Sequence, residues 1–143
     1  KPTFRPNLTS DIVWETKKEW TYCYGQTMFE VYPEVQFMDY TALSFRFGDW
    51  HERKIPSNYH LTFSLKEDNE DLAREILARG HNVAGVLRVK KGEPFPVTYW
   101  GVPVIDGDEH DLRFLDQKGC FVALRPKGTK GLRDTSGFVR DVS

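Results

Sequence analysis

Residues 59–89 read YHLTFSLKEDNEDLAREILARGHNVAGVLRV, and this stretch decides the fold that the sequence predicts. Residues 59–65 place Tyr, Leu, Phe and Leu at alternating positions, which is typical of a strand. Residues 68–80 begin with the helix-capping pair Asp-Asn, carry apolar side chains at helical spacing and end on a glycine. Residues 81–89 follow at once as a second strand. Two strands joined by a helix through tight connections predict a βαβ unit with parallel strands.

Outside this unit, four more stretches have the composition of strands, at residues 3–8, 35–40, 97–105 and 120–124. Thr27 and Glu30 have capping-box spacing, which predicts a short helix that begins after Thr27 and ends before Pro33. We therefore predict an α/β fold in which a largely parallel sheet, open or closed as a partial barrel, has its helices outside. Residues 1–143 are expected to form a single domain whose Lys, Arg and Gly-rich segment 126–143 is a loop or a loose extension.

Composition excludes several classes of protein. The chain has 143 residues, 39% of them hydrophobic, and a net charge of −1, which argues against a protein that coats nucleic acid by bulk charge. No apolar run reaches the roughly 18 residues of a membrane helix, and no signal peptide is apparent, so we expect a cytoplasmic protein that does not bind membranes. Cys23 and Cys120 are expected to be reduced thiols.

The densest polar cluster is the run DGDEHD at residues 106–111, directly after a predicted strand. Hard divalent cations such as Mg²⁺ or Mn²⁺ prefer several oxygen ligands at short range. Asp106, Asp108 and His110 are therefore the candidates both for catalysis and for binding a metal. A second interpretation needs no function, because Asp-Gly-Asp forms turns readily and acidic residues cap short helices.

Other polar residues close predicted strands earlier in the chain. Asn7 and Asp11 follow the first strand, and Asp39 closes the strand at residues 35–40. If the strands are parallel, their carboxyl ends share one edge, where α/β proteins bind ligands. We therefore predict that Asn7, Asp11 and Asp39 bind a ligand at a common cleft, with helix capping as the alternative role for Asp11.

The third set of candidates lies in the segment 126–143. Lys127, Lys130 and Arg133 alternate with glycines, which lets backbone amides and basic side chains approach a phosphate. The run is not a P-loop, because G-x-x-x-x-G-K-[ST] is absent. A solvated tail is the alternative interpretation.

Several phrases of the chain resemble an uncharacterised family of bacteriophage-encoded proteins. They are FRPNLTSDIVWE (4–15), EVQFMDYT (34–41), NYHLTFSLKE (58–67), DGDEHDLRFLD (106–116) and KGTKGLRDTSGFV (127–139). The resemblance covers most of the chain, and it further implies a radical-SAM-like partial (β/α) barrel. The chain departs from that pattern, since Cys23 and Cys120 cannot supply the three clustered thiolates that such an iron–sulfur centre needs.

Two hypotheses about function follow. The first is a phage-type accessory protein that binds a phosphate-bearing small molecule or nucleic acid at the strand-end cleft, with metal assistance as an option. The second is a non-catalytic protein that binds a host protein through exposed aromatic residues such as Trp20, Trp50 and Trp100.

Overall fold

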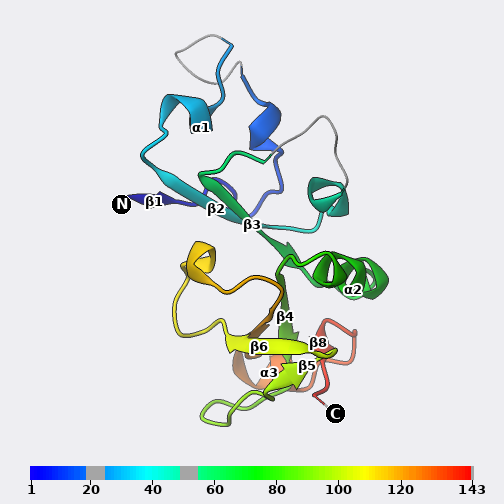
Figure 1. Ribbon diagram of the computed structural model, residues 1–143. Coiled ribbons are helices and arrows are strands. Elements are labelled where there is room, and N and C mark those ends of the chain that lie inside the picture. Colours follow the sequence, from blue (N-terminus) through cyan, green and yellow to red (C-terminus); the bar gives the residue numbers. More distant parts are fainter. Residues whose placement is uncertain (19–24, 49–54, 143) are drawn as a thin grey trace.

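The predicted βαβ unit forms the centre of the computed structural model (Figure 1). Strand β3 (Tyr59–Ser64) leads into helix α2 (Glu70–Ala78), and strand β4 (Val83–Leu87) returns parallel to β3. Gly80, with φ of +87°, ends the helix in the left-handed conformation that a glycine tolerates. The structure describes residues 1–18, 25–48 and 55–142.

Helix α2 packs one apolar face against the protein core. Ala73, Ile76 and Leu77 are buried, as their spacing predicts, whereas Leu72 from the same predicted stripe is 42% exposed. Asn69 precedes the first turn, but its side chain bonds to the backbone of the preceding loop and not to the helix. Asn69 therefore fixes the connection between β3 and α2, and the predicted side-chain cap of the helix is not formed.

Within the described residues, eight strands form one sheet in the order β1-β2-β3-β4-β7-β6-β5, with β8 paired to β4. The strands not yet defined are β1 (Thr3–Phe4), β2 (Gln36–Thr41), β5 (Thr98–Tyr99), β6 (Val102–Asp106), β7 (Phe121–Leu124) and β8 (Val139–Arg140). Their pairings are parallel except for that between β5 and β6. The sheet is open, because β1 and β5 stand at opposite ends of the order. The sheet of the predicted α/β fold is thus largely parallel, as expected.

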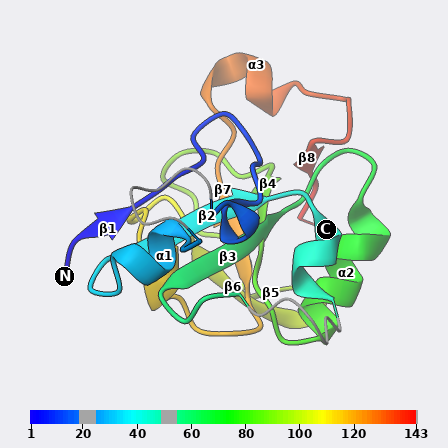
Figure 2. The same ribbon diagram turned by 90° about the horizontal axis from the view of Figure 1, so that it is seen from above.

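Helices are the minor part of the fold. Besides α2 there are α1 (Met28–Val31), α3 (Gly128–Leu132) and three 3₁₀ turns, η1 (Trp14–Thr16), η2 (Ser44–Phe47) and η3 (Arg113–Leu115). The capping box of α1 is confirmed, since the Thr27 backbone N–H donates to the Glu30 carboxylate at 2.6 Å. Figures 1 and 2 show these helices as separate short pieces, so the predicted outer helical layer is not seen.

The prediction of one strand over residues 97–105 is wrong. The chain reverses at Trp100 and Gly101, whose φ angles are +52° and +79°, and it forms the antiparallel pair of β5 and β6. A tryptophan in the left-handed region is strained. The ring of Trp100 stacks on Tyr99 and packs edge-on against Phe121, and these contacts offset the backbone strain.

The prediction that residues 126–143 are loose is also wrong. This segment carries α3 and β8, and β8 pairs with β4 in parallel. Arg88, just after β4, donates to the carbonyls of Leu132 and Asp134, and Arg140 pairs with Glu70 at the start of α2. These long-range bonds hold a charged segment on the sheet.

The two faces of the sheet differ. One face joins α2 in the main hydrophobic core, which includes Phe63 and Phe121. Side chains alternate along a strand, so the neighbours of core residues point to the other face. There Val122 and Cys120 form a smaller cluster with Ala84, covered in part by Tyr40.

Candidate ligand-binding site at the strand ends

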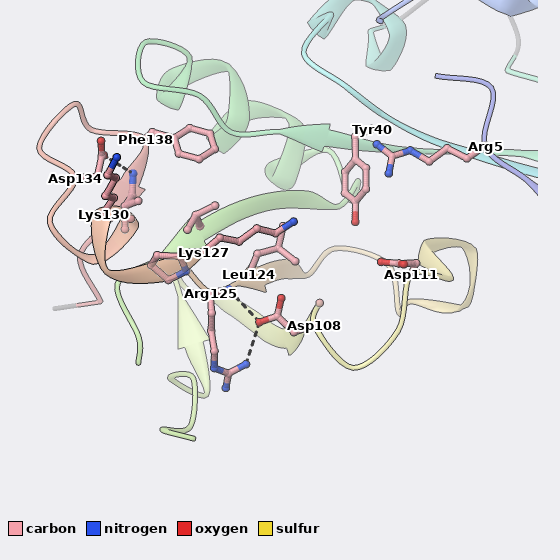
Figure 3. A pocket seen from close by; sticks show the side chains of 15 residues that line it. Arg5, Tyr40, Asp108, Asp111, Leu124, Arg125, Lys127, Lys130, Asp134 and Phe138 are labelled. Atoms are coloured by element: carbon pink, nitrogen blue, oxygen red, sulfur yellow. Dashed lines mark hydrogen bonds and ion pairs between the residues drawn. The ribbon is translucent and has the colours of Figure 1, made fainter. Parts of the chain in front are cut away.

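A cavity of about 760 Å³ opens on the face of the sheet that carries the smaller cluster (Figure 3). Tyr40 in β2, Val86 in β4 and Leu124 in β7 line it, together with Gly107 just after β6. These positions lie at or near the carboxyl ends of parallel strands, where ligands bind in open α/β sheets. The volume is within the roughly 300–1,000 Å³ of small-molecule sites.

The predicted site residues fall into groups around this cavity. Asp108, Lys127 and Lys130 line it, Asn7, Asp11 and Asp39 belong to a polar network beside it, and Asp106, His110 and Arg133 are not among its lining residues. Arg5 connects the first two groups, because it lines the cavity while its Nε lies 3.9 Å from Asp39 Oδ1. The polar strand ends therefore gather on one side of the sheet, but they do not share one pocket.

The polar network is centred on the buried carboxylate of Asp39. The Asn7 backbone N–H donates to it at 2.9 Å, the Asn7 side-chain amide at 3.1 Å and the Tyr59 hydroxyl at 2.6 Å. Burial raises the pKa of Asp39 above its usual value, and the bonds from Tyr59 and Asn7 oppose that shift. Asn7 also accepts from the Trp14 indole N–H at 2.9 Å. This arrangement anchors the N-terminal segment to β2.

A buried arginine completes the network. Arg46 donates to both oxygens of Glu15, at 3.0 and 2.7 Å, and lies 3.3 Å from the Asp11 carboxylate. Asp11 in turn accepts from the Thr41 hydroxyl at 2.7 Å. The side chain of Arg46 is 0% exposed and that of Glu15 5%. These bonds give Asn7, Asp11 and Asp39 a role in holding the fold. That they bind a ligand stays a prediction.

The acidic residues at the end of β6 and in the loop after it form ion pairs with a second arginine. Arg125 Nη1 lies 2.9 Å from Asp106 Oδ2 and 3.1 Å from Asp108 Oδ2. The Asp108 backbone N–H donates to Asp106, which is the predicted turn. His110 instead accepts from the Leu112 backbone N–H at 3.1 Å. In the part of the chain that the structure describes, no three His, Cys, Asp or Glu side chains are grouped so that they could hold a metal ion.

The basic side chains on the other wall of the cavity have fewer protein partners. Lys127 precedes α3 and Lys130 lies within it, and both are exposed. Across residues 1–18, 25–48 and 55–142, neither lysine has an ion-pair partner. Gly131 fits closely against Pro126, since a Cβ there would lie 2.8 Å from the Pro126 Cβ. The close fit fixes α3 beside the cavity.

Two aromatic rings line the cavity next to basic groups. The Arg5 guanidinium lies 4.8 Å from the centre of the Tyr40 ring, and Lys66 Nζ lies 5.6 Å from that of Phe138. Burial raises the pKa of Tyr40, so its hydroxyl stays protonated at neutral pH. Figure 3 shows both rings along one side of the cavity, with Arg125 and Asp108 across from them.

A buried positive charge lies behind the cavity wall. A Cβ on Gly107 would lie 2.9 Å from Arg113 Nη1, so only glycine lets this guanidinium pack there. Arg113 is 1% exposed, and its carboxylate partner is Asp116, with Nε and Oδ2 3.3 Å apart. Burial raises the pKa of Asp116, and the charge of Arg113 opposes that shift. The two side chains form a buried ion pair on this side of the sheet.

Three residues that line the cavity were not predicted from the sequence, namely Arg5, Arg125 and Phe138. Arg5 follows β1 directly and Arg125 follows β7 directly, so the strand-end rule that selected Asp39 would have selected both. The rule failed for Arg5 because the first strand ends at Phe4 and not at residue 8. Phe138 carried no local signal, since its place depends on the pairing of β8 with β4.

Cys120 is buried and unpaired, and burial raises the pKa of its thiol to about 11. A thiol in that state is not a nucleophile at neutral pH. The other predicted thiol, Cys23, lies outside the described residues, as do Trp20 and Trp50.

Two histidines lie near the amino ends of β3 and β4. Burial lowers the pKa of His60 below its usual value, and the charges of Arg113 and Lys118 lower it further. The pKa of His81 is lowered by burial and then by Arg79 and Lys118. In the unfolded chain both side chains titrate near their usual pKa of about 6.5.

We expect the melting temperature to fall as the pH is lowered from about 7.5 to 5.5. Over that window the unfolded state binds protons at His60 and His81 that the folded state does not, so protonation favours unfolding. Calorimetry of His60→Gln should show a smaller drop than the parent protein, because the variant lacks one of the two side chains with a lowered pKa. An equal drop in both proteins would assign the pH dependence to other groups.

The fold and the cavity define a small α/β protein with one open, largely parallel sheet and a basic, aromatic cavity at its strand ends. The chain belongs to the family described as Gene product 88, whose family model matches residues 1–142. This match supports the resemblance to a phage-type family. The predicted radical-SAM-like barrel is not supported, because the sheet is open. Neither the curated proteins nor the solved structures contain a match to the chain.

None of the helices formed by the described residues is long and apolar enough to cross a membrane.

Proposed function

We propose that this protein binds a phosphate-bearing ligand in the strand-end cavity. The observation that carries the proposal is the pair Lys127 and Lys130, which line the cavity and have no ion-pair partner in the described chain. A phosphate gains most from cations that are not already neutralised. Arg5, at the opposite wall, adds a third basic group.

The carboxylates of the cavity are largely satisfied by protein groups. Asp108 is paired with Arg125, and Asp134 accepts from the Ser136 hydroxyl at 2.9 Å and from the Val139 backbone N–H at 3.2 Å. Asp111 is the remaining acidic lining residue, and it is exposed. The four basic lining residues, Arg5, Arg125, Lys127 and Lys130, outnumber the three carboxylates, so the net positive charge of the lining favours an anion.

The proposal gives the acidic loop a supporting role. Asp106 and Asp108 hold Arg125 beside the cavity, where the arginine also stacks on Phe95 with 4.0 Å from guanidinium to ring centre. Metal-assisted catalysis by Asp106, Asp108 and His110 stays a prediction from the sequence.

Titration with inorganic pyrophosphate tests the proposal. We expect Lys127→Gln/Lys130→Gln to bind at least about tenfold more weakly than the parent protein, because hydrogen bonds from charged groups contribute roughly 1.5–3 kcal/mol each. Lys91→Gln is the matched control, since Lys91 is exposed and outside the cavity. Calorimetric affinities that fall equally in both variants, or a parent protein that does not bind, would contradict the proposal.

One observation favours a second candidate function, the binding of a host protein. An apolar groove of about 320 Å³ beside the edge strand β1 is lined by Phe4, Tyr32 and Phe37 among others, and Phe4 is 56% exposed. An extended segment of a partner could add to such an edge. Of the tryptophans predicted for this role, Trp100 packs on Phe121 and under Arg74, so it is not a free anchor. A parent protein that fails to bind pyrophosphate would leave this candidate to be tested.

A further inference from the structure

We infer that the ligand of this site is single-stranded nucleic acid, with bases stacked on Tyr40 and Phe138 and phosphates held by the basic side chains around them. The inference rests on the proposed function and narrows it to one class of ligand. It is drawn from the shape of the site, the pairing of rings with cations and the nature of the sheet face.

The site is longer than the main cavity. A second cavity of about 210 Å³ adjoins it, and the two share five lining residues, which are Arg5, Tyr40, Val86, Leu124 and Phe138. Together they form one groove across the sheet, which we call the strand-end groove. It has Lys127 and Lys130 in one part and Lys66 in the other. A continuous groove with cations in both parts suits a chain of phosphates better than one phosphate group.

The shared part of the strand-end groove contains both aromatic rings. Each ring has a basic group over one of its faces, Arg5 at 4.8 Å from the Tyr40 centre and Lys66 at 5.6 Å from the Phe138 centre. Proteins that bind single strands without strong sequence preference combine such stacking platforms with a basic track for the backbone. The arrangement places a phosphate-binding group beside each surface on which a base can stack.

The floor of the groove is a sheet face with small side chains. Ala84 and Gly85 in β4 line the second cavity, and no described helix lies among its lining residues. Sheet faces that carry aromatic residues are a common surface on which proteins bind the unstacked bases of single strands. In a duplex the bases are stacked on each other, so they cannot reach Tyr40 and Phe138. The groove therefore discriminates against double strands.

Fluorescence anisotropy with labelled 15-mers tests the inference. The probes are oligothymidylate, oligouridylate and a duplex of the same length, each measured at several salt concentrations. We expect the single strands to bind at least about tenfold more tightly than the duplex. With three or four phosphate contacts, the plot of log affinity against log salt should have a slope of roughly −2 to −3. The two single strands show whether the sugar and the thymine methyl group together change the affinity.

Groove variants separate stacking from charge. Tyr40→Leu and Phe138→Leu should each weaken binding roughly 5- to 150-fold, the range for losing one stacked base. Tyr40→Phe keeps the ring and should bind like the parent protein, which distinguishes lost stacking from lost folding. Lys127→Gln should flatten the salt slope by about 0.7. Phe45→Leu, at a 37% exposed aromatic outside the groove, is the control and should have no effect.

The outcomes distinguish the inference from the proposed function. If pyrophosphate binds through Lys127 and Lys130 but the single strands bind no better than pyrophosphate or the duplex, the inference fails and the proposed function stands. If the single strands bind and the groove variants do not weaken them, binding occurs elsewhere and the inference fails. If neither probe binds the parent protein, both fail together.

Discussion

Replacing Arg46 with methionine should lower the free energy of unfolding at neutral pH by about 3–5 kcal/mol, the range for removing one partner of a buried ion pair. The side chain of Arg46 is 0% exposed, and it holds Glu15, itself 5% exposed, through two hydrogen bonds of 3.0 and 2.7 Å. Without the guanidinium the buried Glu15 carboxylate loses the ion pair that compensates its charge. Urea denaturation followed by circular dichroism measures the change.

A second variant identifies the cause of that loss. Arg46→Met/Glu15→Gln removes the uncompensated charge, so it should be more stable than Arg46→Met by at least about 1 kcal/mol. Arg74→Met is the matched control, because Arg74 forms an exposed pair with Glu70 on α2, where the side chains are 47% and 36% exposed. Exposed pairs contribute roughly 0–1 kcal/mol. A double variant as unstable as the single one would show that the arginine acts through packing and not through charge.

This network also shows where reasoning from sequence succeeds and fails at the candidate site. Asn7, Asp11 and Asp39 were predicted because each follows or closes a predicted strand, and they do gather on one side of the sheet. The rule could not show that Arg46 and Tyr59 satisfy them internally, because such partners come from segments far along the chain. Polar residues at strand ends therefore indicate the right region of the fold. They do not show which residues stabilise the fold and which bind a ligand.

The same division between local and long-range signals applies to the fold. The unit at residues 59–89 was predictable because its apolar spacing and its terminal glycine are local signals. The reversal at Trp100 was not, because a left-handed tryptophan depends on the packing of its ring against Phe121. The pairing of β8 with β4 depends on contacts such as Arg88 with Asp134. Contacts of that kind cannot be predicted from a composition rich in Lys, Arg and Gly.

Phe121→Ala should be the most destabilising single change in the hydrophobic core, with a loss of about 3–5 kcal/mol, as for large aromatic truncations. Phe121 is 0% exposed in the central strand β7, and its ring contacts those of Tyr99 and Trp100, with centres 4.8 and 5.5 Å away. It therefore links the β5–β6 hairpin to the sheet. Phe4→Ala, at a 56% exposed ring, is the control and should cost far less.

A substitution in the neighbouring strand β4 tests whether Phe121 stabilises the protein through packing. A Cβ on Gly85 in β4 would lie 2.7 Å from Phe121 Cζ and 2.9 Å from Leu65 Cδ2, so Gly85→Ala should cost about 1–3 kcal/mol by overpacking. In the Phe121→Ala background the closer of these two contacts is gone, so adding Gly85→Ala should cost less than it does in the parent protein. Denaturation of the four proteins of this cycle gives the coupling. Strictly additive losses would mean that Phe121 and Gly85 do not pack against each other.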